Sequence, residues 1–221
     1  MISLRADLSS DGRRIAISGS RGIWIFRRSG VGAHRLAFAP PTAPVLPDWV
    51  TWAPNGRRLV FTRNEALFTI GTGGRKAKKL LDGNAYAPDW SPTGATIVYV
   101  RNPSPRTGGG LIQSIAPNGG EHRSIVRGGH PDVSPDGSRL AFARRNGIYV
   151  VPMAGGEPKL IVRNGEHPEW SPDGRYLAFT RPVVCGESGC SGRVFIVRAT
   201  GGRPRPIGPL VFDIGPLAWS R

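Results

Sequence analysis

The apolar residues of the chain occur in short runs separated by polar turn residues. Five of these runs are similar. Each is five residues long and rich in aliphatic, β-branched and aromatic side chains, which favour extended strands. They are RIAIS (14–18), RLVFT (58–62), TIVYV (96–100), RLAFA (139–143) and YLAFT (176–180). Apolar residues nowhere sustain the i, i+3, i+4, i+7 spacing of an amphipathic helix. The pattern therefore predicts many short strands and few helices.

A turn that ends in glycine precedes each of the five runs. Glycine adopts the positive φ that a tight turn between antiparallel strands requires. The turn glycines are Gly12, Gly56, Gly94, Gly137 and Gly174, at intervals of 37 to 44 residues. A four-stranded propeller blade occupies about 40 to 45 residues. The spacing therefore predicts five consecutive blades.

The remaining strands of each copy follow from the same alignment. An aromatic or aliphatic residue before the turn marks the first strand: Leu8, Trp52, Trp90, Val133 and Trp170. Apolar segments after the second strand mark the third: 23–26, 67–70, 112–115, 148–151 and 194–197. The fourth strand is short and charged, as in KAKKLL (76–81) and EPKLIV (157–162). Charge on an outer strand discourages pairing with another chain.

These elements predict an all-β fold, a β-propeller of four-stranded antiparallel blades in a single domain over 1–221. We place the blades at about 1–47, 48–86, 87–130, 131–167 and 168–216, with 217–221 as the start of a further blade. Five repeats fit either an incomplete six-bladed ring or a five-bladed propeller. The glycines at 108–110 are expected in a flexible loop between the second and third strands of the third copy.

The repeats resemble those of TolB-like propellers, whose pattern is close to P-x-W-S-P-D-G-x-x-I-A-F. HPDVSPDGSRLAFA (130–143) and HPEWSPDGRYLAFT (167–180) follow it almost letter for letter, and the first repeat follows it least. The resemblance covers nearly the whole chain and implies the propeller fold. The same repeat occurs in periplasmic TolB and in propeller domains of prolyl-oligopeptidase-like enzymes, so it leaves the function open. Such propellers usually have six blades, and Trp219-Ser220 begins the first-strand motif again.

The chain is strongly basic, with a formal net charge of +15 over 221 residues. Arginine supplies 26 of the 30 basic residues, and the arginines are dispersed along the whole length. Phosphate binding needs charge concentrated on one face, so a nucleic-acid partner is not favoured despite the charge. No apolar run reaches the roughly 20 residues of a membrane helix, and the N-terminal segment lacks the pattern of a secretory signal.

Sequence motifs of catalysis are missing. The chain has no G-x-S-x-G, no G-x-x-x-x-G-K-[ST] and no H-E-x-x-H, which are the signatures of hydrolase nucleophiles, phosphate loops and zinc proteases. We therefore expect no catalytic residues, no cofactor and no metal.

An acidic residue recurs just before the aromatic position of the first strand. Four of the five copies have it: Asp7, Asp89, Asp132 and Glu169. Thr51 takes its place in the second copy, and His130 and His167 stand two residues earlier in the last two. In one interpretation these residues ring a channel mouth and bind a cation, an amine or a basic peptide. In the other, which we favour, the carboxylates accept hydrogen bonds from backbone or arginine groups of a neighbouring blade.

An arginine closes the second strand in four copies: Arg63, Arg101, Arg144 and Arg181. These side chains could form a cationic rim for anionic ligands. The alternative is that they are solvated or pair with the acids, as exposed ion pairs worth about 0–1 kcal/mol each.

The two cysteines, Cys185 and Cys190, lie five residues apart in an insertion between the second and third strands of the last copy. We predict that they form a disulfide across a glycine-rich loop, in preference to free thiols or a metal site. Disulfides form and persist in oxidising compartments, so this prediction favours a periplasmic or extracellular location.

Two functional hypotheses follow. The first is a non-catalytic TolB-like propeller that binds a protein or peptide partner. The alternative is the propeller portion of a prolyl-oligopeptidase-like serine hydrolase whose catalytic domain is absent from this chain.

Overall fold

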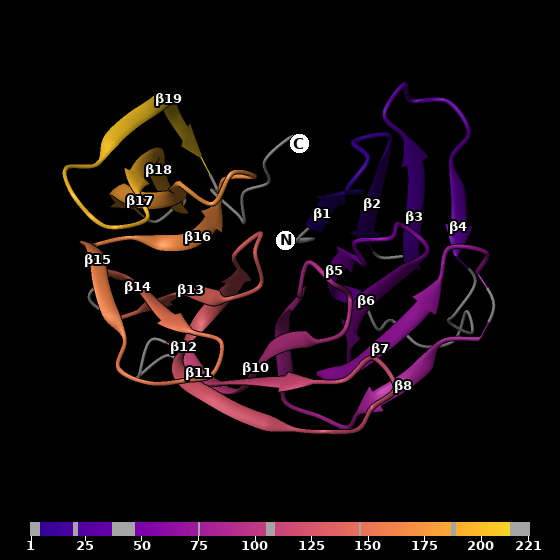
Figure 1. Ribbon diagram of the computed structural model, residues 1–221. Helices are drawn as coiled ribbons and strands as arrows, with labels where there is room; N and C mark the ends of the chain where they lie inside the picture. The colour runs from indigo at the N-terminus through magenta and orange to yellow at the C-terminus, as the bar shows by residue number, and fades with distance from the viewer. Residues whose placement is uncertain are drawn as a thin grey trace. The chain divides into compact units, whose positions relative to one another are not determined.

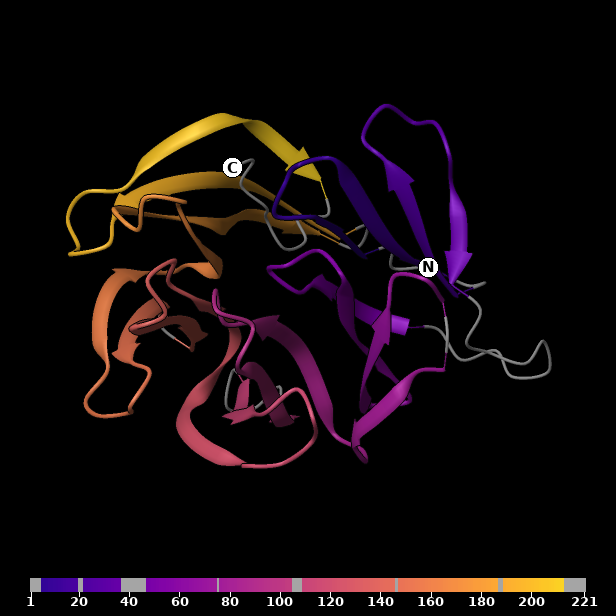
Figure 2. The ribbon, with the colours of Figure 1, turned by 45° about the vertical axis from the view of Figure 1, so that its right-hand side comes forward.

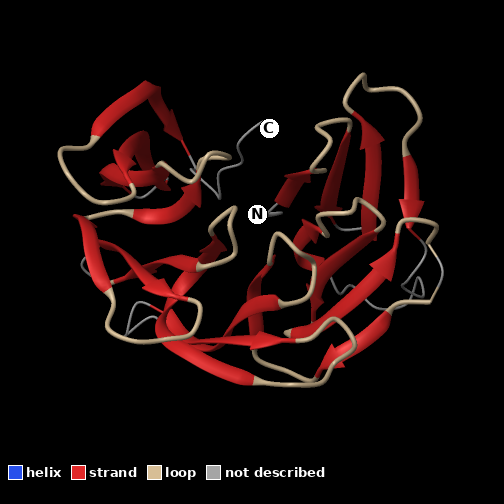
Figure 3. Ribbon diagram, viewed as in Figure 1, coloured by secondary structure: helices blue, strands red, loops and turns tan. Residues whose placement is uncertain are grey.

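The computed structural model describes residues 5–19, 22–36, 47–74, 76–104, 109–145, 147–186 and 189–212. This part of the chain contains nineteen strands and no helix (Figure 3). Consequently, no helix able to span a membrane occurs among these residues. The predicted all-β architecture is confirmed.

The chain divides into two compact units. Unit 1 is built from Met1–Arg101 and Gln113–Arg123, and unit 2 from Asn102–Ile112 and Ser124–Trp219.

Unit 1 begins with two four-stranded antiparallel sheets, in which each strand pairs with the next along the chain (Figure 1). The first consists of β1 (Arg5–Leu8), β2 (Arg14–Gly19), β3 (Gly22–Arg27) and β4 (His34–Leu36). The second consists of β5 (Pro47–Trp52), β6 (Arg58–Arg63), β7 (Ala66–Gly71) and β8 (Lys78–Leu81). Both are propeller blades, as the repeat pattern predicts.

A longer sheet follows, because one strand serves two consecutive blades. Its members are β9 (Ala85–Trp90), β10 (Ile97–Ser104), β11 (Gly109–Ile115), β12 (Arg123–Val133), β13 (Arg139–Arg144), β14 (Gly147–Pro152) and β15 (Lys159–Arg163), paired in sequence order. Strand β12 has eleven residues and is both the fourth strand of one blade and the first of the next.

The glycines at 109 and 110 begin β11 and do not form the flexible loop expected there. Gly109 has φ +149, and a Cβ atom on it would lie 2.3 Å from the backbone carbon of Gly128. A close approach of two backbones therefore requires glycine at this position. Residue 108 lies outside the described residues.

The last blade consists of β16 (Glu166–Trp170), β17 (Tyr176–Gly186), β18 (Gly189–Arg198) and β19 (Arg205–Phe212), of which β17 and β18 are the longest. Strands β17 and β18 pair antiparallel from Tyr176↔Arg198 to Gly186↔Gly189, with one register shift between Pro182 and Val184. The long hairpin that they form is visible in Figure 2. The insertion expected to be a loop is thus an extension of the hairpin. Residues 213–221, with the predicted restart at Trp219-Ser220, lie outside the described residues.

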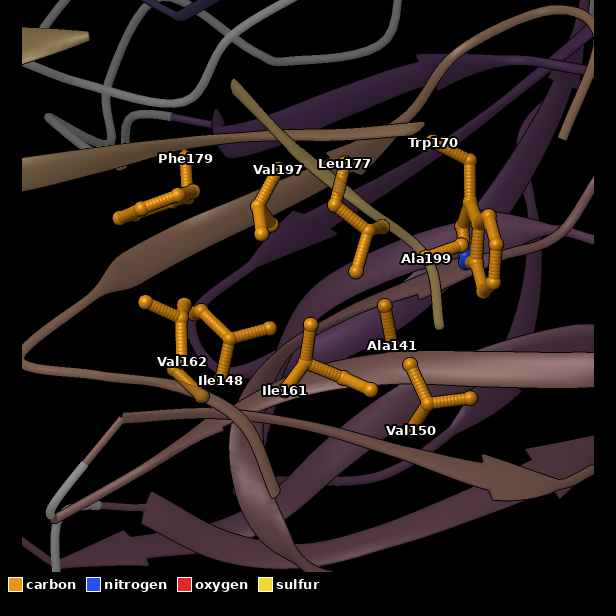
Figure 4. Close-up of a cluster of buried hydrophobic side chains, with 11 residues drawn as sticks. Ala141, Ile148, Val150, Ile161, Val162, Trp170, Leu177, Phe179, Val197 and Ala199 are labelled. Atoms are coloured by element: carbon orange, nitrogen blue, oxygen red, sulfur yellow. The ribbon is translucent and has the colours of Figure 1, made fainter. Parts of the chain in front are cut away.

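Hydrophobic cores lie between consecutive blades. In unit 2, Leu177 and Phe179 of β17 pack on Ile148 of β14 and Ile161 of β15 (Figure 4). In unit 1, one core joins the first blade to Leu59 and Phe61 of the second. Sheets that stack remove their apolar faces from water, and this burial stabilises the fold by about 25 cal/mol per Å² of apolar surface.

The turn between the first and second strands has one repeated hydrogen-bond pattern. In the fourth blade the Ser134 hydroxyl donates to Asp136 Oδ1 at 2.5 Å, and the same oxygen accepts the Ser138 N–H at 3.0 Å. These bonds, first the one from Ser134, lower the pKa of Asp136 to about 2. The equivalent bonds lower the pKa values of Asp11 and Asp173. The serine and the aspartate of the SPDG sequence therefore have a structural role in this turn.

Candidate functional site

The acidic position of the first strand connects one blade to the next. In unit 1, Asp7 Oδ2 accepts the backbone N–H of Trp52 at 2.7 Å, and the Asp7 carbonyl accepts the Trp52 indole N–H at 3.1 Å. In unit 2, Asp132 makes the same pair of contacts with Trp170, at 2.5 Å and 3.2 Å. These bonds support a structural role for the acids. Asp89 and Glu169 occupy the same strand position in β9 and β16.

Two arginines that the sequence analysis did not single out also contact these tryptophans. The Arg14 guanidinium lies 4.6 Å from the ring centroid of Trp52, and that of Arg139 lies 4.5 Å from the ring of Trp170. Such a cation–π contact is worth about 0.5–1 kcal/mol at an exposed site. The signal in the sequence was the arginine that opens the second strand in these repeats.

The arginines that close the second strands pack against the third strands. Arg63 lies 5.0 Å from the ring centroid of Phe68 in unit 1. In unit 2, Arg144 lies 5.5 Å from Tyr149, and Arg181 lies 4.7 Å from Phe195. Arg101 is half-buried in β10. Arg63, Arg144 and Arg181 therefore contact aromatic rings of the third strands.

His130 and His167 lie beside each other in unit 2, with ring centroids 4.0 Å apart and an interplanar angle of 47°. Both have left-handed backbone, with φ +48 and +50. Each lies at a bulge where the register of the first strand shifts, between Gly129 and Asp132 and between Glu166 and Glu169. Ala87 has φ +45 at the equivalent position. The backbone conformation therefore belongs to the repeat and does not by itself indicate function.

Thr180 fixes the orientation of the His167 ring. Thr180 Oγ1 lies 3.1 Å from His167 Nδ1 and donates its own hydrogen to the Glu166 carbonyl at 3.1 Å. The ring is thereby tied to the β16–β17 pair.

A pocket of about 510 Å³ lies in unit 2 at the ends of its strands. The β13–β14 turn and the β15–β16 link form its walls. Its ionisable side chains are Arg144, Arg145, Arg181, His130 and Glu166. The pocket unites two residues of the predicted cationic rim with one of the predicted histidines. Of the acidic ring, Asp132 and Glu169 are absent from its lining.

Sequence reasoning missed Arg145 and Glu166, although each is adjacent to a residue that was predicted. Nothing in the local pattern distinguishes them from other exposed charged residues. Among the residues that the structure describes, no group of three or more His, Cys, Asp or Glu side chains is arranged to hold a metal ion.

The two cysteines occupy opposed positions on paired strands. The β17–β18 register pairs Cys185 with Cys190. Opposed residues of antiparallel strands have Cα atoms about 4.5 to 5.5 Å apart, within the range of disulfides. The two side chains lie outside the described residues, so the disulfide stays a prediction.

Comparison with known proteins identifies the fold. No family model and no curated protein matches the sequence. Among solved structures, a putative TolB from Agrobacterium tumefaciens is similar with a TM-score of 0.80 and 16% identity, over 96% of this chain and 82% of that one. TolB from Acinetobacter baumannii is similar with a TM-score of 0.68 and 13% identity, over 92% and 56%.

An enzyme is among the similar structures as well. Oligogalacturonate lyase in complex with manganese has a TM-score of 0.67 and 13% identity, over 93% of this chain and 66% of that one. The chain thus has the TolB-like β-propeller fold, and this fold serves both TolB proteins and enzymes.

Proposed function

We propose that the chain is a non-catalytic binding module of the TolB-like type, which takes a segment of a protein or peptide partner in the pocket of unit 2. The observation that carries the proposal is the pocket itself. Its volume of about 510 Å³ lies within the roughly 300–1,000 Å³ range of ligand sites.

Two closely packed glycines line the pocket. Gly147 and Gly165 are buried there, and a Cβ atom on either would lie 1.9 Å from the Val162 carbonyl oxygen or 2.8 Å from the Phe179 ring. The backbone at both glycines is therefore closely packed against neighbouring residues of unit 2. A preformed site loses little conformational entropy on binding.

The rest of the repeat chemistry supports a structural scaffold. Asp7 and Asp132 bond to the tryptophans of the following blades, and Ser134 bonds to Asp136 within its turn. This leaves the pocket side chains as the candidates for recognition. The resemblance to periplasmic TolB and the opposed cysteines support a place outside the cytoplasm.

A pocket-filling substitution tests the proposal. Glu166 is exposed and lines the pocket, so Glu166→Trp introduces bulk without removing an arginine. We expect the native protein to retain members of a fluorescein-labelled random octapeptide library in equilibrium dialysis, and Glu166→Trp to reduce retention at least tenfold.

Glu157→Trp is the matched control, since Glu157 is an exposed acid of unit 2 that does not line the pocket. It should bind like the native protein. No retained peptide, or equal retention by Glu166→Trp, would overturn the proposed function.

A further inference from the structure

The geometry points to a carboxylate-binding site: we propose that the pocket recognises aspartate or glutamate side chains of an acidic peptide segment, mainly through Arg144 and Arg181. This inference rests on the proposed function and names the chemical class of its ligand.

The charge of the pocket favours an anion. Three arginines line it against the single carboxylate of Glu166. In the described part of the chain, a salt bridge joins Lys79 to Asp82 in unit 1, and none is found at Arg144, Arg145 or Arg181. The positive charge of the three arginines is therefore not neutralised by a salt bridge to a described carboxylate.

Arg144 is held in place by neutral groups. Its Nε and Nη2 donate to the Arg127 carbonyl at 3.1 Å and 2.9 Å, and its guanidinium lies over Phe142 and Tyr149. A guanidinium has five N–H donors, so these two bonds leave three. The carbonyl fixes the side chain but does not cancel its charge.

Arg181 repeats this arrangement one blade later. Its Nε donates to the Asn164 carbonyl and its Nη2 to the Arg163 carbonyl, both at 2.9 Å. Its guanidinium lies over Phe179 and Phe195. Two ordered guanidiniums, each with remaining donors, thus line one pocket.

A fixed guanidinium is well suited to a carboxylate. The planar fork of N–H groups matches two carboxylate oxygens, and such charge-assisted bonds are about twice as strong as neutral ones. A free arginine loses up to about 2 kcal/mol of side-chain entropy when it is ordered. In Arg144 and Arg181 the fold has already ordered the side chain.

Three labelled tetrapeptides, acetylated and amidated, separate the possibilities: tetraglutamate, tetraglutamine and tetralysine. In fluorescence anisotropy we expect tetraglutamate to bind at least tenfold more tightly than tetraglutamine, and tetralysine not to bind. The double variant Arg144→Gln/Arg181→Gln should weaken tetraglutamate at least tenfold.

Controls separate this site from the general charge of the protein. Arg205→Gln removes an exposed arginine of unit 2 outside the pocket and should change tetraglutamate affinity less than twofold. If the double variant does not fold, Arg145→Gln, at an exposed pocket residue, should still weaken tetraglutamate threefold or more.

Each contrary result has a separate meaning. Equal binding of tetraglutamate and tetraglutamine, both lost in Glu166→Trp, would overturn the carboxylate inference and leave the proposed function standing. Equal weakening by Arg205→Gln would show that the binding is non-specific. Glutarate and inorganic phosphate test whether a free anion is enough. If either displaces labelled tetraglutamate at the concentration at which unlabelled tetraglutamate does, the inference that the anion belongs to a peptide is overturned.

Discussion

At the scale of residues, a side chain that resembles a ligand-binding group often serves the backbone of its own fold. Asp132 illustrates this, since its carboxylate and its carbonyl both accept hydrogen bonds from Trp170 of the next blade. Arg144 and Arg181 also bond to backbone carbonyls, but they retain unused donors in a pocket. The two cases differ in location, because the arginines line the pocket and Asp132 does not.

The bond between Asp132 and Trp170 predicts a loss of stability. Asp132→Ala removes a charged acceptor from the Trp170 N–H and should lower the free energy of unfolding by about 1–3 kcal/mol. Urea unfolding followed by tryptophan fluorescence measures the change. Glu157→Ala removes the same charge at an exposed position and should have little effect. Unchanged stability together with lost binding of a cationic probe such as spermine would favour the acidic ring as a ligand site.

The turn aspartates predict a pH dependence below pH 4. The pKa of Asp136 falls from 3.8 to about 2 on folding, mainly through the Ser134 hydroxyl and then Ser138. The unfolded chain therefore binds more protons between these values, so this stabilisation is complete above about pH 4 and lost as the pH falls toward 2. Urea unfolding at pH 5, 4, 3 and 2 should show this decline.

Asp136→Thr is the natural control, because Thr93 occupies the same turn position in the third blade and bonds to Ser91. This variant should lose less stability than the native protein between pH 4 and pH 2. The same decline in both proteins would contradict the assignment to Asp136. Asp11 and Asp173, with lowered pKa values, should contribute residual decline in the variant.

At the scale of elements, the repeat defines the strands, and insertions lengthen them. The run 58–62 lies in β6 (Arg58–Arg63), and the run 139–143 in β13 (Arg139–Arg144). In the last blade the insertion continues β17 and β18 as a hairpin, which satisfies the backbone N–H and carbonyl groups that a loop would leave to water. Glycines in a sequence therefore do not by themselves predict a flexible loop.

The extended hairpin predicts a bridge between Cys185 and Cys190, which its register places opposite each other. Thiol titration of the denatured, unreduced protein should find no free thiol, and titration after reduction should find two. Protein prepared under oxidising conditions is the appropriate material. Two free thiols before reduction would remove the support for the disulfide and weaken that for an extracellular location.

At the scale of the whole molecule, contacts that recur from blade to blade account for some of the many arginines. The net charge of +15 comes from dispersed arginines, and several of them have local partners in the fold. Arg14 and Arg139 lie over tryptophans, and Arg144 and Arg181 over aromatic rings of third strands. These contacts explain basic residues without a nucleic-acid partner, which stays disfavoured as a prediction.

The sequence by itself determined the all-β fold, the turns and most strand positions. These depend on contacts between near neighbours, such as Ser134 with Asp136, and on alternation of apolar residues, and both can be read along the chain. The pocket was decided only by the tertiary structure. It brings together His130, Arg144, Glu166 and Arg181, which are distant in the sequence. These residues come together because two blades stack. No local sequence pattern determines the distances between residues of stacked blades.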